Sequence, residues 1–327
     1  MRSENCSTER YDRGGMSADR IDLLTEGATV EVEVGADLVR QLVDTQFPAW
    51  SSWPLRRWER AGSDHVIYRL GDCLAVRLPR GDWPAGQAPK EHAWLPRLAP
   101  HLPLAIPMPV GLGEPALGYP WSWSVVRWLD GDAVVAERLG DSEETARDLA
   151  AFLTALQRLP SPDSFAPGPH PELRRRTLAA KDDRVRASIA AVATVFDADA
   201  LTRVWERALA APVWAGEPVW CHGDFHVGNL LGQGERVTAV LDFGGLGYGD
   251  PACDLDIAFT LMTERTRAVF RSALGLDEAA WVRGLGWALA GGVTAYAAYA
   301  ATEPRVVAQT RRQIAEVLAE DATLYLR

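Results

Sequence analysis

The sequence lacks the marks of several protein classes. No apolar run resembles a signal peptide or a membrane span, and the four cysteines form no C-x-x-C pair and no metal-ligand spacing, so we expect reduced thiols in a cytoplasmic protein without a membrane partner. Positive charge is not in excess: the net charge of −10 argues against nucleic acid as a partner and is compatible with a cationic substrate. An internal repeat and a G-x-G-x-x-G phosphate loop are missing as well.

What the chain does have is enough apolar sequence for a sizeable core. Its 327 residues exceed one average domain, and 47% of them are hydrophobic, which suits two lobes that share one cleft. Residues 1–20 are polar and charged, and we expect them to form a disordered leader.

One segment points directly to a chemistry. It reads His222-Gly-Asp-Phe-His-Val-Gly-Asn229, and Asp242-Phe-Gly follows thirteen residues after the Asn. Phosphoryl transfer depends on alignment and on neutralising charge, so it needs a carboxylate at the incoming hydroxyl and oxygen ligands for Mg²⁺. Asp224, Asn229 and Asp242 supply that set, and the five-residue step from Asp224 to Asn229 equals the step between the catalytic Asp and the metal-binding Asn of protein kinases.

The residues between Asn229 and Asp242 predict a short hairpin. Two leucines, a Gly-Gln-Gly-Glu turn and the run 237–241 would return Asp242 to the side of Asn229. A lone Asp in a loop is more often a cap or a solvated turn residue. Three polar groups in this order on a strand-turn-strand frame favour a functional site.

These motifs resemble those of the aminoglycoside phosphotransferase family, small-molecule kinases with a protein-kinase-like fold. The family's H-G-D-x-x-x-x-N stands at 222–229, its D-F-G at 242–244 and its G-D-P-x-x-D-L at 249–255. The resemblance implies an α+β bilobal fold with an N-terminal antiparallel sheet lobe and a larger helical C-terminal lobe. It further implies that Asp224 is the catalytic carboxylate, that Asn229 and Asp242 bind Mg²⁺, and that ATP or GTP is the phosphate donor.

Three other residues of these motifs have less direct roles. The resemblance implies that His222 braces the loop and does not accept the proton. Asp250 and Asp254 are expected to be structural, with Asp254 bonded to the catalytic-loop backbone. His226 could face substrate or solvent, and the sequence leaves its role open.

A nucleotide-gripping sheet is expected upstream of these motifs. The runs 65–70 and 73–78 are rich in β-formers and are separated by Gly71-Asp72, a two-residue hairpin signal. In the second run Ala75 and Arg77 share one face, as in the kinase strand where a basic residue holds the phosphates. The usual Lys is replaced by Arg77, whose planar guanidinium binds phosphate with a different geometry. Glu91, on a helical stripe with Trp94, is the candidate partner of Arg77, although Pro96 could end that helix.

Two further segments complete the predicted nucleotide site. Gly62 and Ser63 occupy the place of a phosphate-covering loop, a prediction that rests on position alone. The strand 121–128 leads into a Gly-containing link, so we expect a purine to lie against Val126, Arg127 and Trp128. The predicted division is an N-lobe at 21–128, a hinge link at 129–132 and a helical C-lobe at 133–327.

Helical periodicity dominates the C-lobe. Helices are predicted at 143–159, 173–195, 201–209, 255–263, 266–273, 278–300 and 304–326, with a loop at 161–171, and an opening strand-to-helix segment is predicted at 32–47.

The acceptor is the least determined part of the prediction. Glu264, Asp277, Glu278 and Glu303 are acids that could meet a cationic antibiotic, but solvated helix faces explain them equally well. Trp281 and Trp287 could stack on a sugar or a macrocycle, or pack in the core. We therefore expect a kinase of an antibiotic, aminoglycoside-like or macrolide-like. A kinase of a metabolite such as an amino alcohol or a sugar, and a nucleotide-binding pseudokinase, are the alternatives. The sequence does not indicate the oligomeric state.

Overall fold

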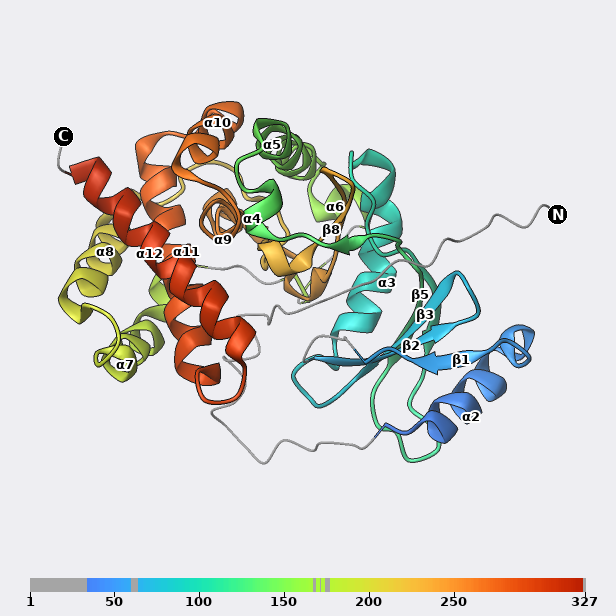
Figure 1. Ribbon diagram of the computed structural model, residues 1–327. Coiled ribbons are helices and arrows are strands. Elements are labelled where there is room, and N and C mark those ends of the chain that lie inside the picture. The colour runs from blue at the N-terminus through green and yellow to red at the C-terminus, as the bar shows by residue number, and fades with distance from the viewer. Residues whose placement is uncertain (1–33, 60–63, 167–168, 171, 174–176, 326–327) are drawn as a thin grey trace.

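The chain folds into a sheet-containing part followed by a mainly helical part, as expected (Figure 1). The structure is a computed structural model that describes residues 34–59, 64–166, 169–170, 172–173 and 177–325. Its first part comprises α2 (Ala36–Gln46), β1 (Leu55–Arg57), β2 (His65–Leu70), β3 (Leu74–Pro79), α3 (Gln87–Leu98), β4 (Pro109–Gly113) and β5 (Trp123–Arg127).

The first part is built on one antiparallel sheet with the strand order β1-β2-β3-β5-β4. Residues of β3 alternate between two surroundings, because successive side chains of a strand point to opposite faces. Leu74, Val76 and Leu78 pack in the core of this part, whereas Ala75 belongs to a small apolar cluster with Ile67 and Val126. The predicted sharing of one face by Ala75 and Arg77 thus places both on the side of the sheet that faces the cleft.

Two local predictions in this part need correction. The hairpin turn has three residues, not two, because Leu70 pairs with Leu74 and β3 begins one residue later than predicted. Gly71 begins the turn with a φ of +58°, a left-handed conformation that favours glycine. Pro96 does not end α3, which continues to Leu98.

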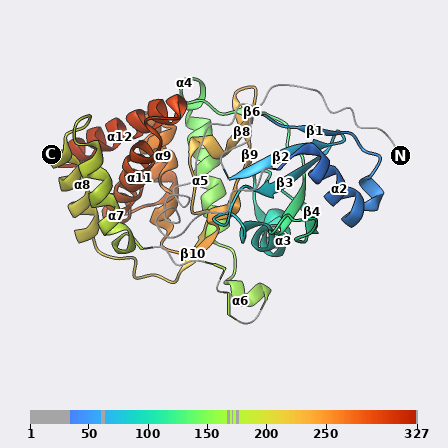
Figure 2. The same cartoon turned by 90° about the horizontal axis from the view of Figure 1, so that it is seen from below.

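The second part contains short strands and most of the helices. They are β6 (Asp132–Ala133), α4 (Ala136–Leu139), α5 (Glu143–Gln157), α6 (Pro162–Phe165), α7 (Asp182–Val192), α8 (Ala198–Ala210), β7 (Val219–Cys221), β8 (Leu230–Gln233), β9 (Arg236–Val240), β10 (Gly247–Gly249), α9 (Ile257–Thr260), α10 (Glu264–Leu274), α11 (Glu278–Tyr299) and α12 (Pro304–Tyr325). Figure 2 shows the three-stranded sheet of β6, β8 and β9 between the helices and the N-terminal sheet. The predicted hairpin between Asn229 and Asp242 is therefore present as β8 and β9.

Three of the predicted segments of this part differ from the structure. The helix predicted at 173–195 begins only at Asp182, and the loop predicted at 161–171 contains the short α6. The helix predicted at 255–263 is shortened to α9, because Thr263 starts a new helix: its side chain and that of Thr266 form a capping box at the first turn of α10.

Helix α11 is buried on nearly every side and forms the centre of the helical part. It packs against α7, α8 and α12. Although α11 is long and apolar, no helix among the described residues meets the length and hydropathy needed to cross a membrane.

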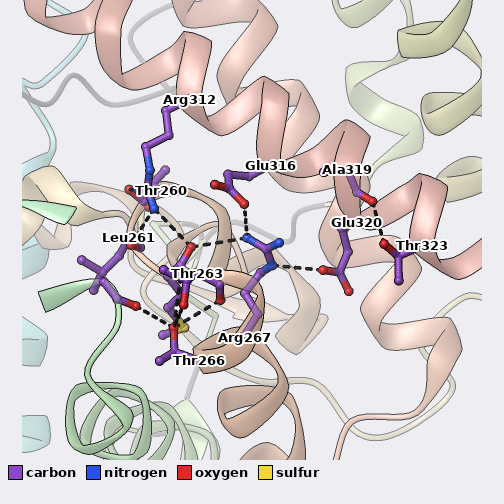
Figure 3. Close-up of polar contacts among 12 residues, drawn as sticks. Thr260, Leu261, Thr263, Thr266, Arg267, Arg312, Glu316, Ala319, Glu320 and Thr323 are labelled. Carbon is purple, nitrogen blue, oxygen red and sulfur yellow. Dashed lines mark hydrogen bonds and ion pairs between the residues drawn. The ribbon is translucent and has the colours of Figure 1, made fainter. Parts of the chain in front are cut away.

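A buried polar network fixes α12 against the ends of α9 and α10 (Figure 3). Arg267 is 2% exposed and its guanidinium donates to Glu316 at 2.5 Å and to Glu320 at 3.0 Å. Arg312 donates to the carbonyl oxygens of Thr260 at 2.6 Å and Leu261 at 2.9 Å. These contacts set the position of α12 relative to the segment that follows the catalytic motifs.

Candidate active site

The segment 222–229 forms a loop between β7 and β8. Asp224 lies in it with 9% of its surface exposed. The side-chain amide of Asn229 donates to the Asp224 carboxylate at 3.1 Å and to the Asp224 carbonyl at 2.9 Å. The five-residue step of the sequence therefore closes the loop on itself and fixes the direction of the carboxylate.

His222 holds this loop from inside. It is fully buried, its Nδ1 accepts from the Asp224 N–H at 3.2 Å, and its Nε2 lies 3.0 Å from the Leu241 carbonyl. Burial lowers the pKa of His222, so the ring is neutral and carries its proton on Nε2. The contacts agree with a bracing role, because both ring nitrogens are already engaged.

Two acids of the downstream motif anchor neighbouring backbone. Asp254 is fully buried and accepts from the N–H groups of His222 at 2.8 Å and Gly223 at 2.7 Å, which confirms the predicted bond to the catalytic loop. Asp250 caps its own turn through the Ala252 N–H and accepts from Arg283 of α11 at 2.7 and 3.2 Å.

The second predicted metal ligand lies beside the first. Leu241 donates its N–H to the Asn229 carbonyl at 2.8 Å, which places the following residue, Asp242, next to the catalytic loop. Asp242 has a left-handed backbone with φ of 59°, a conformation that costs about 1–3 kcal/mol in a non-glycine residue and occurs often at functional sites. A Cβ on Gly245 would lie 2.8 Å from the Gly223 backbone, so glycine is needed where the two loops touch.

The donor set of these loops fits Mg²⁺. Asn229 commits its amide nitrogen to Asp224, which leaves the amide oxygen as the group able to bind a cation. Together with the Asp242 carboxylate it gives hard oxygen donors, and Mg²⁺ usually takes one or two protein ligands of this kind and completes its shell with water and phosphate.

Arg77 and Glu91 form the ion pair predicted from the sequence. Arg77 Nη1 lies 2.5 Å from Glu91 Oε2, and the side chains are 7% and 1% exposed. Burial alone would lower the pKa of Arg77, but the carboxylates of Glu91, Asp242 and Asp64 raise it, so the guanidinium stays charged. The Asp242 charge thus lies near enough to raise the pKa of Arg77, so β3, α3 and the loop that begins at Asp242 meet at this ion pair.

Sequence reasoning missed Lys90, which links α3 to the loop that begins at Asp242. Its ammonium group donates to the Gly244 carbonyl at 2.5 Å across 154 residues of sequence. A Cβ on Gly244 would lie 2.5 Å from the Gln87 side chain, so α3 packs directly on this loop. No periodicity signal could have shown the contact, because it depends on how α3 docks.

A largely apolar pocket lies between the two parts of the chain. Asp242 lines it, as do five of the residues predicted to hold a nucleotide. These five are Ala75, Arg77, Val126, Arg127 and Trp128. Ile67 and Leu241 complete its apolar walls, and the rings of Trp58 and Trp128 meet edge to face. A mainly apolar lining with a few polar groups is typical of small-molecule sites.

The backbone of the 126–128 segment is partly occupied. The Arg127 N–H donates to the Met108 carbonyl and the Trp128 N–H to the Cys73 carbonyl, each at 2.8 Å. A purine edge that paired with these two N–H groups would break these backbone hydrogen bonds. The groups left to pair with a purine are backbone carbonyls of this segment or the backbone of Leu129, the next residue of the pocket wall. Gly62 and Ser63, predicted to contact phosphate, lie outside the described residues.

On the other side of the catalytic loop, the acid that lines a pocket with Asp224 is Asp256. None of Glu264, Asp277, Glu278 and Glu303 lines that pocket. Asp256 accepts from Gln313 of α12 at 2.7 Å. His226, whose role the sequence left open, lies 3.6 Å from the Asp224 carboxylate and 3.2 Å from the Asn229 amide nitrogen. Asp256 follows Asp254 by two positions, a spacing that carried no signal of its own.

The pKa of Asp256 predicts a pH effect on stability. Burial raises this pKa to about 7, opposed by His226 and reinforced by Asp224. The folded chain therefore binds more protons than the unfolded chain between about pH 4 and 7, and stability falls as the pH rises through that window. Relative to the wild type, Asp256→Asn should gain about 2–4 kcal/mol between pH 5 and pH 8 in urea unfolding. Parallel curves for the two proteins would contradict this.

Comparison with known proteins matches most of the chain to a family of phosphate-transferring enzymes. The family model described as "Phosphotransferase enzyme family" (APH) matches residues 58–319. A comparison with curated proteins finds no match.

Solved structures share the fold over most of the chain. The GDP complex of wild-type aminoglycoside 2'-phosphotransferase-IIIa is 19% identical, with a TM-score of 0.66, over 86% of this chain and 98% of that chain. For the GDP and kanamycin complex of APH(2")-IIia the values are 19% and 0.63, over 88% and 99%. Macrolide 2'-phosphotransferase MphH from Brachybacterium faecium is 23% identical with a TM-score of 0.58, over 86% and 96%. At these identities the likeness shows the fold, which is the kinase-like one.

Proposed function

The chain belongs to the phosphotransferase enzyme family, APH, and is a small-molecule kinase of that family. We propose that it transfers the γ-phosphoryl group of ATP or GTP to a hydroxyl of an antibiotic, aminoglycoside-like or macrolide-like. The observation that carries the proposal is the meeting of Asp224, Asn229 and Asp242 at two loops beside a pocket that contains Arg77. This is the set of groups that phosphoryl transfer needs.

Each group has one role in the proposed reaction. The acceptor oxygen forms a bond to phosphorus while the bond to the leaving diphosphate breaks, and the hydroxyl proton passes to the Asp224 carboxylate. Asn229 and Asp242 would hold Mg²⁺, which would neutralise phosphate charge. Arg77, kept in place by Glu91, meets the phosphates, and the pocket of Ala75, Val126 and Trp128 holds the purine.

A non-catalytic nucleotide binder receives less support. Its main argument was the replacement of the usual Lys by Arg77, yet Arg77 makes the buried ion pair with Glu91 that positions the basic residue in kinases.

The direct test is product formation. Purified protein with Mg²⁺ and ATP or GTP should add one phosphate group to at least one member of a panel of aminoglycosides, macrolides, peptide and nucleoside antibiotics, as followed by mass spectrometry. Chelation of Mg²⁺ with EDTA should abolish the product, because the phosphates lose their counter-charge. A panel without product, followed by product from amino alcohols or sugars, would replace the antibiotic by a metabolite.

A further inference from the structure

The loop that begins at Asp242 starts in an uncommon backbone conformation. Asp242 has φ of 59° and ψ of 74°, in the left-handed region that residues other than glycine rarely adopt. A strained conformation of this kind persists only where the surrounding structure holds it. The contacts of the residues that follow Asp242 therefore decide whether its carboxylate keeps its direction.

Gly244 fixes that carboxylate through its backbone. Its N–H donates to Asp242 Oδ1 at 3.3 Å. Its carbonyl oxygen accepts from the Lys90 ammonium at 2.5 Å, and the same ammonium donates to the Leu246 carbonyl at 3.4 Å. One side chain of α3 thus holds two carbonyl groups of the segment whose N–H orients the Asp242 carboxylate.

The Lys90 ammonium comes from a helix that already serves the proposed nucleotide site. Lys90 is 8% exposed, and the next residue, Glu91, forms the ion pair with Arg77. Burying an ammonium group is unfavourable unless it is hydrogen-bonded, and the two carbonyl groups supply acceptors. Helix α3 therefore anchors Arg77 through one residue and the loop that begins at Asp242 through the residue before it.

We propose that Lys90 is a positioning residue that keeps the Asp242 carboxylate directed at the Mg²⁺ of the nucleotide complex. The inference rests on the proposed function and adds to it a residue outside the motifs at 222–229, 242–244 and 249–255. Lys90 does not line the pocket beside Arg77 and acts through Gly244. Without its ammonium, the segment 242–246 loses the contact that holds Asp242 in the left-handed conformation.

The test compares Lys90→Met with Arg40→Met. Lys90→Met removes the ammonium and keeps a long unbranched side chain. Arg40 of α2 makes a similar link, to the carbonyl groups of Trp53 at 2.7 Å and Trp50 at 3.4 Å, and none of these three residues lines the pocket proposed for the nucleotide. Both variants thus lose a cation that ties a helix to two carbonyl groups, but only Lys90→Met loses it at the loop that begins at Asp242.

Calorimetry with a non-hydrolysable ATP or GTP analogue separates the two variants. Lys90→Met should raise the Kd measured with Mg²⁺ about tenfold, an effect typical of losing hydrogen bonds to a charged group. The Kd measured in EDTA should change less than about twofold, because purine contacts do not involve this loss. Arg40→Met should change neither Kd. Lys90→Arg keeps a charged donor and should hold the Kd with Mg²⁺ within about threefold of the wild-type value.

Hydrogen exchange tests the same contact without nucleotide, Mg²⁺ or acceptor. Followed by mass spectrometry, the peptide that contains residues 242–246 should exchange about tenfold faster in Lys90→Met than in the wild type, and at the wild-type rate in Arg40→Met. If Lys90→Met does not fold, Lys90→Gln, whose side chain is one atom shorter, takes its place.

A purely structural role for Lys90 has a different outcome. A Lys90→Met protein that melts lower but keeps the wild-type Kd with Mg²⁺ and the wild-type exchange at 242–246 overturns the proposal. A Lys90→Arg protein as weak as Lys90→Met also overturns it. The failure of the proposed function is distinguishable, because the wild type would then phosphorylate no compound while nucleotide-free exchange at 242–246 still reports on Lys90.

Discussion

Asp224→Asn is expected to lower kcat about a thousandfold while leaving the Kd for nucleotide within about a factor of two. The change replaces a carboxylate by an amide of the same shape, which cannot accept the hydroxyl proton. The pocket proposed to hold the nucleotide is lined by other residues, so nucleotide binding should persist. Phosphorylated product measured by mass spectrometry and nucleotide affinity measured by calorimetry give the two quantities.

A structural control separates lost chemistry from lost folding. In Asp224→Asn the new side-chain oxygen would still lie within reach of the Asn229 amide, which in the wild type bonds the Asp224 backbone carbonyl as well as the carboxylate. The melting temperature should therefore change little. Retention of more than about a tenth of wild-type kcat would show that another group takes the proton, and His226, 3.6 Å from the Asp224 carboxylate, would be examined next.

Glu91→Ala should produce the largest loss of stability, about 3–5 kcal/mol, because it leaves the Arg77 charge buried without its partner. The same variant should lower kcat/KM for the nucleotide about a hundredfold, since Arg77 would no longer be held toward the pocket. Urea unfolding and steady-state kinetics with varied nucleotide measure the two effects.

A surface ion pair and a double variant serve as controls. Glu143 pairs with Arg147 one turn away on α5 and with Arg265 of α10, and all three side chains are at least 40% exposed, so Glu143→Ala should cost less than about 1 kcal/mol. Replacing both Arg77 and Glu91 by Met and Leu should recover most of the stability and none of the activity. A double variant that regains activity would remove Arg77 from the proposed mechanism.

Much of the proposed nucleotide and metal site could be predicted from the sequence, because the patterns that indicate it lie within short segments. The five-residue step from Asp224 to Asn229, the hairpin that returns Asp242 and the alternation that pairs Ala75 with Arg77 all follow from the geometry of short segments. The Arg77–Glu91 contact was also predicted, because Glu91 lies on the helical stripe that follows the strand and protein kinases pair a helix Glu with the basic residue of that strand. Element ends were less accurate, because capping and docking decide them, as at Thr263.

The surroundings of Asp224, where the phosphoryl acceptor is proposed to bind, depend on contacts between segments far apart in the chain. Lys90 reaches Gly244, Gln313 of α12 reaches Asp256, and the turn before α7 and helix α11 bring Lys181 and Trp287 to the pocket that contains Asp224. Periodicity marks which face of a helix is buried, but not which helix covers it or which buried donor is left unpaired. The sequence by itself therefore determined the candidate catalytic carboxylate, the candidate metal ligands and the strand that carries Arg77. Only the tertiary structure decided which side chains surround the pocket beside that carboxylate, because helix packing sets those distances.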